Sequence, residues 1–191
     1  MSNAERLTAL AHTAKQREFE CDFVATWEDH ATWDAAVMRQ PTQIPGEFVV
    51  EEEDVLAYNR ALGETDPLLV DPDYAREHAP GGVVVAHPLF ATAVAFWLSR
   101  PGTICSWIRT PGARNPFQHL EIHEPIRVGD RLTATMENSD RFIRRGQHYL
   151  TAHVEVRDQR GMVKVEFSAT LILPANRDQA RRFATALTSP S

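Results

Sequence analysis

Cysteine is scarce in this chain of 191 residues, which contains only two. Cys21 and Cys105 lie too far apart to form a zinc-binding pattern, and two cysteines alone make no disulfide framework. We therefore expect both thiols to be reduced and the protein to reside in a cytoplasm.

Targeting and membrane-spanning segments are also missing. Residues 1–18 contain no apolar core flanked by basic residues, so they do not resemble a signal peptide. The longest apolar run, residues 81–98, is interrupted by His87 and Pro88 and is too short to span a bilayer. The sequence therefore predicts no membrane association.

Positive charge is in deficit, with 20 lysines and arginines against 26 aspartates and glutamates. Nucleic-acid-binding domains usually carry a basic surface, so we expect no nucleic acid partner. No glycine-rich phosphate loop follows a predicted strand, and no serine lies in a nucleophile-elbow sequence. These absences argue against phosphate-loop chemistry and against serine hydrolysis.

The apolar residues, 43% of the chain, are sufficient for one domain with a hydrophobic core. We divide the chain into an N-terminal helical extension (residues 1–46), a main domain (47–175) and a C-terminal tail with a short helix (176–191). The extension carries Trp27 and Trp33, and large apolar rings are rare in disordered tails. We expect it to pack on the main domain.

Hydrophobic periodicity assigns the elements of the main domain. Residues 51–62 predict a helix with acids in its first turn and Gly63 at its C-terminal cap. Residues 88–100 predict a helix that is apolar almost all round and is therefore buried. The expected buried residues of the first helix are Val55, Leu56, Tyr58 and Leu62. The other expected elements are a strand at 47–50, a short helix at 71–78, a loop at 111–116, strands within 119–124, 132–137, 150–156 and 163–173, and a helix at 178–187.

One buried helix followed by alternating strands has a simple packing solution, in which an antiparallel sheet wraps around the helix. This arrangement is the hot-dog fold, of the α+β class. The sheet would keep an open edge, which such sheets usually pair across a dimer, so we expect a dimer of like or unlike subunits.

The turn Gly63–Asp71 resembles the active-site turn of the MaoC-like (R-specific) enoyl-thioester hydratases, which has the form G-D-x-N-P-L-H-x-D. Residues 84–90 are similar to the family's entry into the central helix. Residues 122–130 resemble its H-x-P-I-R-x-G-D strand and turn. The resemblance extends over residues 48–173.

The resemblance implies hydration or dehydration of enoyl or β-hydroxyacyl thioesters, carried by coenzyme A or a carrier protein, with no metal and no other cofactor. Glu64 stands at the position of the family's aspartate, Asp66 at the asparagine, and Leu69 at the histidine. Pro88 replaces a glycine whose N–H helps to hold the thioester carbonyl, and proline has no N–H. With these two departures, at Leu69 and Pro88, the chain resembles the non-catalytic halves of two-domain MaoC proteins and of the mycobacterial dehydratase pair.

The candidate catalytic residues are Glu64, as general base or acid, and His87, as its partner in place of the missing histidine. Each also has a purely structural interpretation, as a surface acid near a helix end and as a histidine at a helix start. The candidate substrate-binding residues are Asp66, Leu69, Pro88, Leu89, Arg144 and Arg145. For Asp66 a local backbone hydrogen bond is the competing explanation, and Asp71 is expected to cap the next helix.

Arg144 and Arg145 lie in a predicted hairpin, where arginines are usually solvated. The alternative is that they bind the phosphates of coenzyme A or of a carrier-protein arm. His119 and His123 are expected on one face of a strand with Glu121 on the opposite face, and we expect no metal there.

Three functions are compatible with the sequence. The chain is a hydratase or dehydratase in its own right, a non-catalytic acyl-binding subunit that needs a partner, or a hot-dog enzyme with another thioester reaction such as hydrolysis or ring closure. Glu64 is central to the first.

Overall fold

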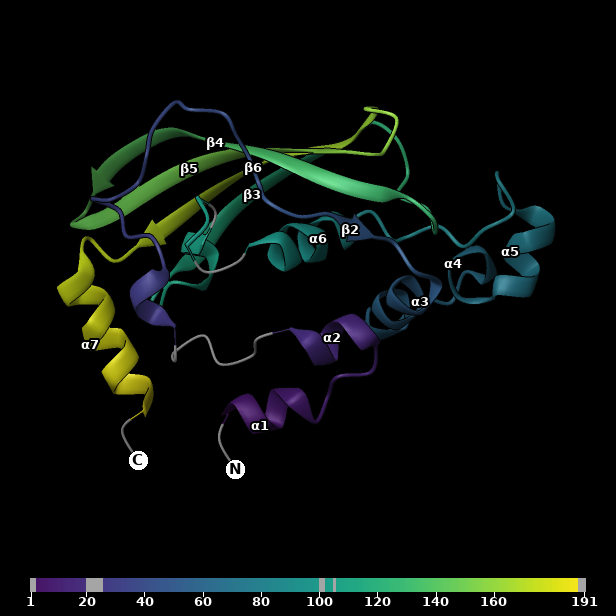
Figure 1. The fold of residues 1–191 in the computed structure, drawn as a ribbon, viewed down its shortest axis with the longest axis horizontal. Coiled ribbons are helices and arrows are strands. Elements are labelled where there is room, and N and C mark those ends of the chain that lie inside the picture. The colour runs from purple at the N-terminus through teal and green to yellow at the C-terminus, as the bar shows by residue number, and fades with distance from the viewer. Residues whose placement is uncertain (1–2, 20–25, 100–101, 105, 189–191) are drawn as a thin grey trace.

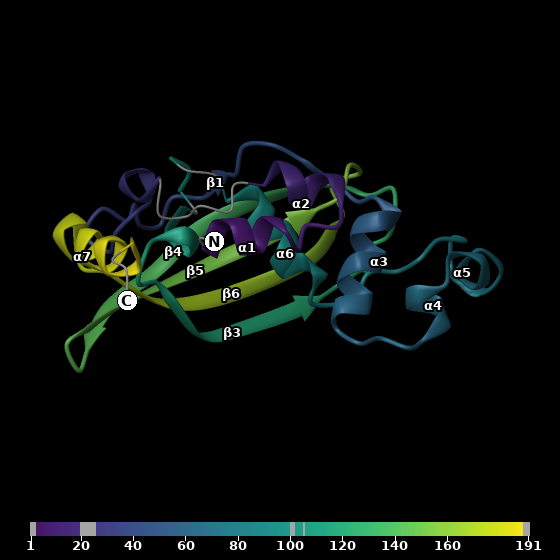
Figure 2. The same ribbon diagram turned by 90° about the horizontal axis from the view of Figure 1, so that it is seen from below.

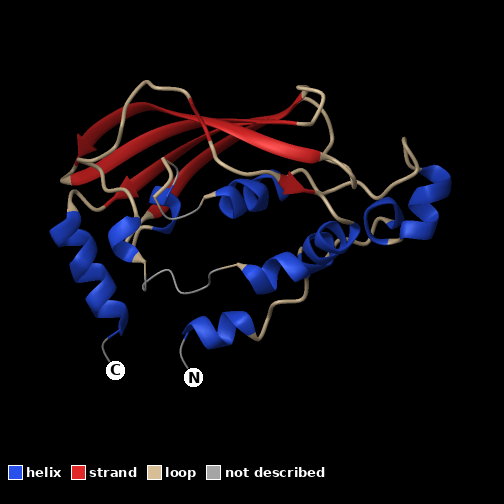
Figure 3. Ribbon diagram, viewed as in Figure 1, coloured by secondary structure: helices blue, strands red, loops and turns tan. Residues whose placement is uncertain are grey.

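The structure is a curved antiparallel sheet with the helices on one side and at its two ends (Figure 1, Figure 3). The computed structural model describes residues 3–19, 26–99, 102–104 and 106–188, so Cys21 and Cys105 lie outside the described residues. Helix α6 lies directly against the sheet, which confirms the predicted α+β hot-dog fold. The elements are α1 (Asn3–Thr8), α2 (Ala14–Glu18), η1 (Trp27–Asp29), β1 (Thr42–Gln43), β2 (Phe48–Val49), α3 (Glu52–Ala61), α4 (Pro67–Val70), α5 (Pro72–His78), α6 (Phe90–Leu98), η2 (Ser106–Arg109), β3 (Arg114–Ile122), β4 (Arg131–Arg144), β5 (Gln147–Arg157), β6 (Val163–Leu173) and α7 (Arg177–Thr188).

The sheet has the strand order β1-β4-β5-β6-β3, and β2 also pairs with β4. Every second residue is buried over 132–138 in β4, 150–156 in β5 and 165–173 in β6, as the alternation in the sequence predicted. In β5 these residues are Leu150, Ala152, Val154 and Val156. A buried leucine or valine contributes roughly 1.5–3 kcal/mol to folding, so these rows fix which face of the sheet covers α6.

Helix α6 is shorter than predicted, because Pro88 and Leu89 form a turn before it rather than its first residues. Phe90, Ala91, Val94, Ala95 and Leu98 are buried, whereas the opposite side of the helix is only partly covered. On that side the ring of Phe19 packs 5.6 Å from the rings of Phe96 and Trp97. Part of the helix's apolar circumference therefore faces the N-terminal extension instead of the sheet.

Strand β3 forms a long edge of the sheet and corrects one prediction. The loop expected at residues 111–116 ends early, because β3 begins at Arg114. The register shifts between Arg114 and Phe117, around Pro116. An edge position tolerates a proline because its missing N–H would have faced away from the ladder.

The N-terminal extension is docked on the main domain. It contains the two short helices α1 and α2 and also the strand β1, which pairs with β4. The indole N–H of Trp33 donates to the carbonyl of Tyr149 at 2.9 Å. In α2 the ammonium of Lys15 contacts the carboxylates of Glu51 and Asp54 at 2.5 and 2.6 Å. Within the described part of the chain, no helix is both long and apolar enough to cross a membrane.

Candidate functional site

The turn after α3 carries the first candidate residue. Gly63 has a positive φ of 77°, a conformation that favours glycine, and it directs the chain away from the helix. The backbone N–H of Glu64 then donates to the carbonyl of Asn59 at 3.1 Å. Glu64 is thereby held against the last turn of α3.

Two aspartates of this turn act as helix caps. The carboxylate of Asp66 accepts the N–H of Leu68 at 2.9 Å and caps α4. Asp71 accepts the N–H groups of Asp73 and Tyr74 at 3.0 and 3.1 Å, which confirms its predicted role as the cap of α5. Asp66 therefore has the local contact that its structural interpretation requires.

The structure brings Glu64 and His87 together. Nε2 of His87 lies 3.4 Å from Oε1 of Glu64, and their side chains are 22% and 28% exposed. Nδ1 of His87 faces the backbone N–H of Leu89 at 3.1 Å. Because that N–H can only donate, Nδ1 is the acceptor, and in the neutral ring the proton is on Nε2, facing the carboxylate. The neutral imidazole thus has a defined tautomer, and its Nε2–H points at the carboxylate of Glu64.

Asn59 is a member of this site that the sequence analysis missed. Its side chain is fully buried, and its amide contacts the backbone at three points near the pair. Leu62, expected on the buried side of α3, is instead 49% exposed. Asn59 lies four residues after the buried Val55, so helical spacing placed both on one face, but a polar residue was not expected there.

The helix entry has few free donors for a substrate carbonyl. Pro88 has no N–H, and the N–H of Leu89 is bonded to His87. The N–H of Phe90 donates to the carbonyl of His87 at 2.8 Å. The lack of a free N–H that the sequence predicts at Pro88 therefore extends to Leu89 and Phe90, whose N–H groups are already bonded.

An apolar cavity of about 720 Å³ lies along the partly covered side of α6. Phe90, Phe96 and Trp97 form one wall, and residues of the N-terminal extension form another. Lys15 is the cation in the lining: burial works to lower its pKa, but hydrogen bonds with Asp54 and Glu51 outweigh this and raise it. Glu64 and His87 do not line the cavity; Tyr58 does, and its ring centre is 6.5 Å from that of His87.

The remaining predicted substrate-binding residues are dispersed. The carbonyl of Leu89 accepts the hydroxyl of Tyr58 at 3.0 Å, and that of Leu69 accepts the amide of Asn59 at 2.7 Å. The β4–β5 turn, which holds Arg144 and Arg145, lies at the end of the sheet away from α3, α4 and α5 (Figure 2). Within one chain these arginines do not join Glu64 and His87.

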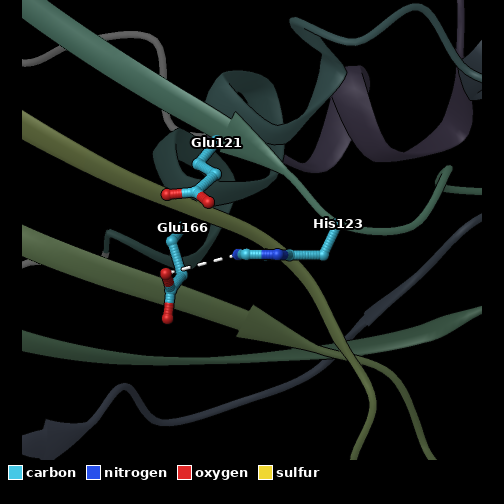
Figure 4. Close-up of side chains that lie close together, drawn as sticks. All are labelled: Glu121, His123 and Glu166. Atoms are coloured by element: carbon cyan, nitrogen blue, oxygen red, sulfur yellow. Dashed lines mark hydrogen bonds and ion pairs between the residues drawn. The ribbon is translucent and has the colours of Figure 1, made fainter.

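A second glutamate–histidine pair lies on β6 and the bend that follows β3 (Figure 4). Nε2 of His123 is 3.3 Å from a carboxylate oxygen of Glu166, and Glu121 lies close by. The expectation that Glu121 faces away from His119 and His123 is wrong: all three are odd-numbered positions, and Glu121 pairs directly with Glu166 in the ladder. The three side chains are close enough to hold a cation, but each is at least partly exposed, and such surface groups are common without one.

Comparison with known proteins agrees with the hot-dog fold. The family described as FAS1-like, dehydratase domain region, matches residues 40–167. A curated relative, UPF0336 protein of Clavibacter michiganensis, is 28% identical over 130 residues, which are 66% of this chain and 85% of that protein.

Two solved structures show the same fold. The HadBC (3R-hydroxyacyl-ACP dehydratase) complex of Mycobacterium tuberculosis matches with 20% identity and a TM-score of 0.62, over 73% of this chain and 98% of that chain. The R-hydratase PhaJ1 of Pseudomonas aeruginosa matches with 19% identity and a TM-score of 0.62, over 77% and 88%. Because the family match spans more than half of the sequence, the chain belongs to the FAS1-like dehydratase domain region family, a group of hydratases and dehydratases with the MaoC-like hot-dog fold.

Proposed function

We propose that this chain adds water to enoyl thioesters, or removes it from β-hydroxyacyl thioesters, with Glu64 as base and His87 as its partner. The observation that carries this proposal is the 3.4 Å contact between the two side chains, with the imidazole fixed at its other nitrogen by Leu89. A base must lie within reach of the proton that it removes and must be held there.

In the hydration direction, the water oxygen bonds to the β-carbon while a water proton passes to the Glu64 carboxylate. A proton is then returned to the α-carbon, so the carboxylate is regenerated. The Nε2–H of His87 stabilises the charged carboxylate between turnovers. In the reverse direction Glu64 removes the α-proton and passes it to the β-hydroxyl, which leaves as water, so the carboxylate is again regenerated.

The 720 Å³ cavity beside α6 supports an acyl substrate, because its size is in the range of small-molecule sites and its walls are mainly apolar. Coenzyme A or a carrier-protein arm would supply the polar end. Arg144 and Arg145 remain candidates for its phosphates only from a second subunit, since their own chain holds them at the other end of the sheet.

The open β3 edge supports a dimer. β3 is nine residues long and exposes Phe117 and Ile122 to 61% and 47%. Unpaired edges of this kind promote pairing with another chain. The proposal also includes reduced cysteines, a cytoplasmic location and a reaction that uses no cofactor.

The direct test is to supply the purified chain with crotonyl and longer enoyl thioesters and to follow the loss of conjugation. Turnover of these substrates is the expected result. Release of free thiol without loss of conjugation would point instead to thioester hydrolysis.

A second candidate is a non-catalytic subunit that binds the acyl group for a partner. It is favoured by Leu69 at the family's histidine position and by the occupied N–H groups at the entry of α6. Co-expression with a second hot-dog subunit separates the two: activity only in the pair supports the subunit role, and activity of the isolated chain excludes it.

A further inference from the structure

Asn59 makes four hydrogen bonds at the centre of the proposed site, three with its side chain and one with its main chain. Its Nδ2 group donates to the carbonyls of Leu69 and Val85 at 2.7 and 3.1 Å. Its Oδ1 accepts the backbone N–H of His87 at 3.0 Å. Its own carbonyl accepts the N–H of Glu64 at 3.1 Å. One residue thus joins the acidic turn, Gly63–Asp71, to the segment that enters α6.

The orientation of this amide is fixed by its partners. All of them are backbone groups whose roles cannot change: two carbonyls that only accept and one N–H that only donates. A flipped amide would place its oxygen against two carbonyls and its NH₂ against an N–H. The observed orientation is therefore the only one that satisfies the buried atoms.

Burial makes these bonds consequential. Asn59 is 0% exposed, so its hydrogen bonds are shielded from bulk water. Removal of the amide would leave the carbonyls of Leu69 and Val85 and the N–H of His87 unsatisfied, and such groups are costly inside a protein. The chain would then relax by moving the segment of His87 relative to α3.

We infer that Asn59 is the positioning residue that sets the distance between Glu64 and His87. This inference rests on the proposed function for its catalytic consequence. Glu64 is held through the main chain of Asn59 and His87 through its side chain, so the two reacting groups share one anchor. The segment of Leu69 is tied to the same anchor.

The fold offers a matched control in Asn138, which is also a buried asparagine, 1% exposed. Its Nδ2 donates to the carbonyl of Val37 at 2.8 Å and joins the N-terminal extension to β4. Asn138→Ala removes a buried amide that has no contact with the pair. If the role of Asn59 were purely structural, both alanine variants, compared while folded, would show the same turnover and the same His87 signals.

The experiment compares Asn59→Ala with Asn138→Ala by two readouts, each at a temperature where thermal melts show the variant folded. The first readout is kcat and KM with an enoyl thioester. The second is the ¹⁵N chemical shifts of the histidine side chains, which report the tautomer of His87 without any need for activity. For Asn59→Ala we expect kcat to fall about 100-fold with KM changed less than threefold, and the His87 signals to shift. For Asn138→Ala we expect neither change.

Equal effects of the two variants on both readouts would overturn the inference. If the wild-type chain has no hydratase activity, the proposed function fails, whereas a His87 shift confined to Asn59→Ala still supports the positioning role. Should Asn59→Ala not fold, the isosteric Asn59→Asp is used, because it keeps an acceptor for His87 but places a second oxygen against two carbonyls. It is judged by the same two readouts.

Discussion

Two glutamate–histidine pairs of almost the same length lie in different parts of this molecule. The Nε2–carboxylate distance is 3.4 Å between His87 and Glu64 and 3.3 Å between His123 and Glu166. The first pair lies between the acidic turn and the entry to α6. The second lies at the edge of the sheet, on β6 and the bend that follows β3.

What differs is how each ring is held. The second nitrogen of His87 is bonded to Leu89, and its backbone is bonded to the buried Asn59. Among the residues that the structure describes, Nδ1 of His123 has no hydrogen-bond partner, and its side chain is 37% exposed. A short distance alone therefore does not distinguish a candidate catalytic pair from a surface ion pair; the fixed orientation does.

Substitution of each histidine in turn should give the largest difference in activity between the two pairs. We expect His87→Gln to lower kcat/KM about 100-fold or more, the range typical for loss of a group that assists proton transfer. His123→Gln should leave kcat/KM within twofold of wild type. Steady-state kinetics with an enoyl thioester measure both, and similar losses in the two variants would remove the distinction.

A third histidine, His30, differs from both because it is fully buried. Burial lowers its pKa from 6.5 to about 4; the positive charges of Arg109 and Arg177 add to this, and Asp29 opposes it. The unfolded chain takes up a proton near pH 6.5, whereas the folded chain does not until about pH 4. Stability is therefore full above pH 6.5, and the free energy of unfolding should fall as the pH drops toward 4, by on the order of 2 kcal/mol.

Denaturant titrations at several pH values between 4 and 7 measure this loss. His30→Gln should flatten the slope that His30 contributes, whereas His123→Gln should keep it. An unchanged pH dependence in His30→Gln would show that another group is responsible.

The sequence was sufficient for the fold because its strands alternate cleanly. Leu150 to Val156 and Val163 to Leu173 could only bury one face, and the apolar residues of α6 needed that face as cover. The early start of β3 was not predictable, because Pro116 signals a loop in sequence and is tolerated only at an edge. That edge exists only in the assembled sheet.

For the site, the sequence supplied Glu64 and His87 but not what holds them. Asn59 was missed because a polar residue in a helix is expected at the surface, and its partners are backbone groups up to 28 residues away. Their positions depend on how α3, α4 and the α6 entry pack. The predicted orientation of Glu121 was wrong for a simpler reason: residues two apart in a strand share a face, so Glu121 lies on the same side as His119 and His123.

Lys15 provides a test of a partly buried ion pair outside the proposed site. It is 15% exposed and contacts Asp54, which is 7% exposed. Lys15→Met should lower the free energy of unfolding by about 1 kcal/mol, because Asp54 loses its partner. Since the pKa of Lys15 is raised, the same contribution should be lost in wild type as the pH rises above 10.5. Urea titration of both proteins at pH 7 and pH 11 checks the two statements.

The smallest effect is expected in the second pair. Glu121 and Glu166 are directly opposite in the ladder, where like charges repel. Glu121→Gln should therefore raise the free energy of unfolding by a few tenths of a kcal/mol. A clear loss of stability would show that Glu121 has a favourable role. Added Zn²⁺ should leave the melting temperature unchanged, and an increase that disappears in Glu121→Gln would reveal a metal site.

The most direct measurement compares Glu64→Gln and Glu166→Gln in one hydration assay with wild type as reference. Both substitutions remove the carboxylate of a glutamate–histidine pair and keep the side chain's size. We predict that Glu64→Gln loses at least about 100-fold in kcat while Glu166→Gln keeps wild-type turnover. Normal turnover by Glu64→Gln would contradict it.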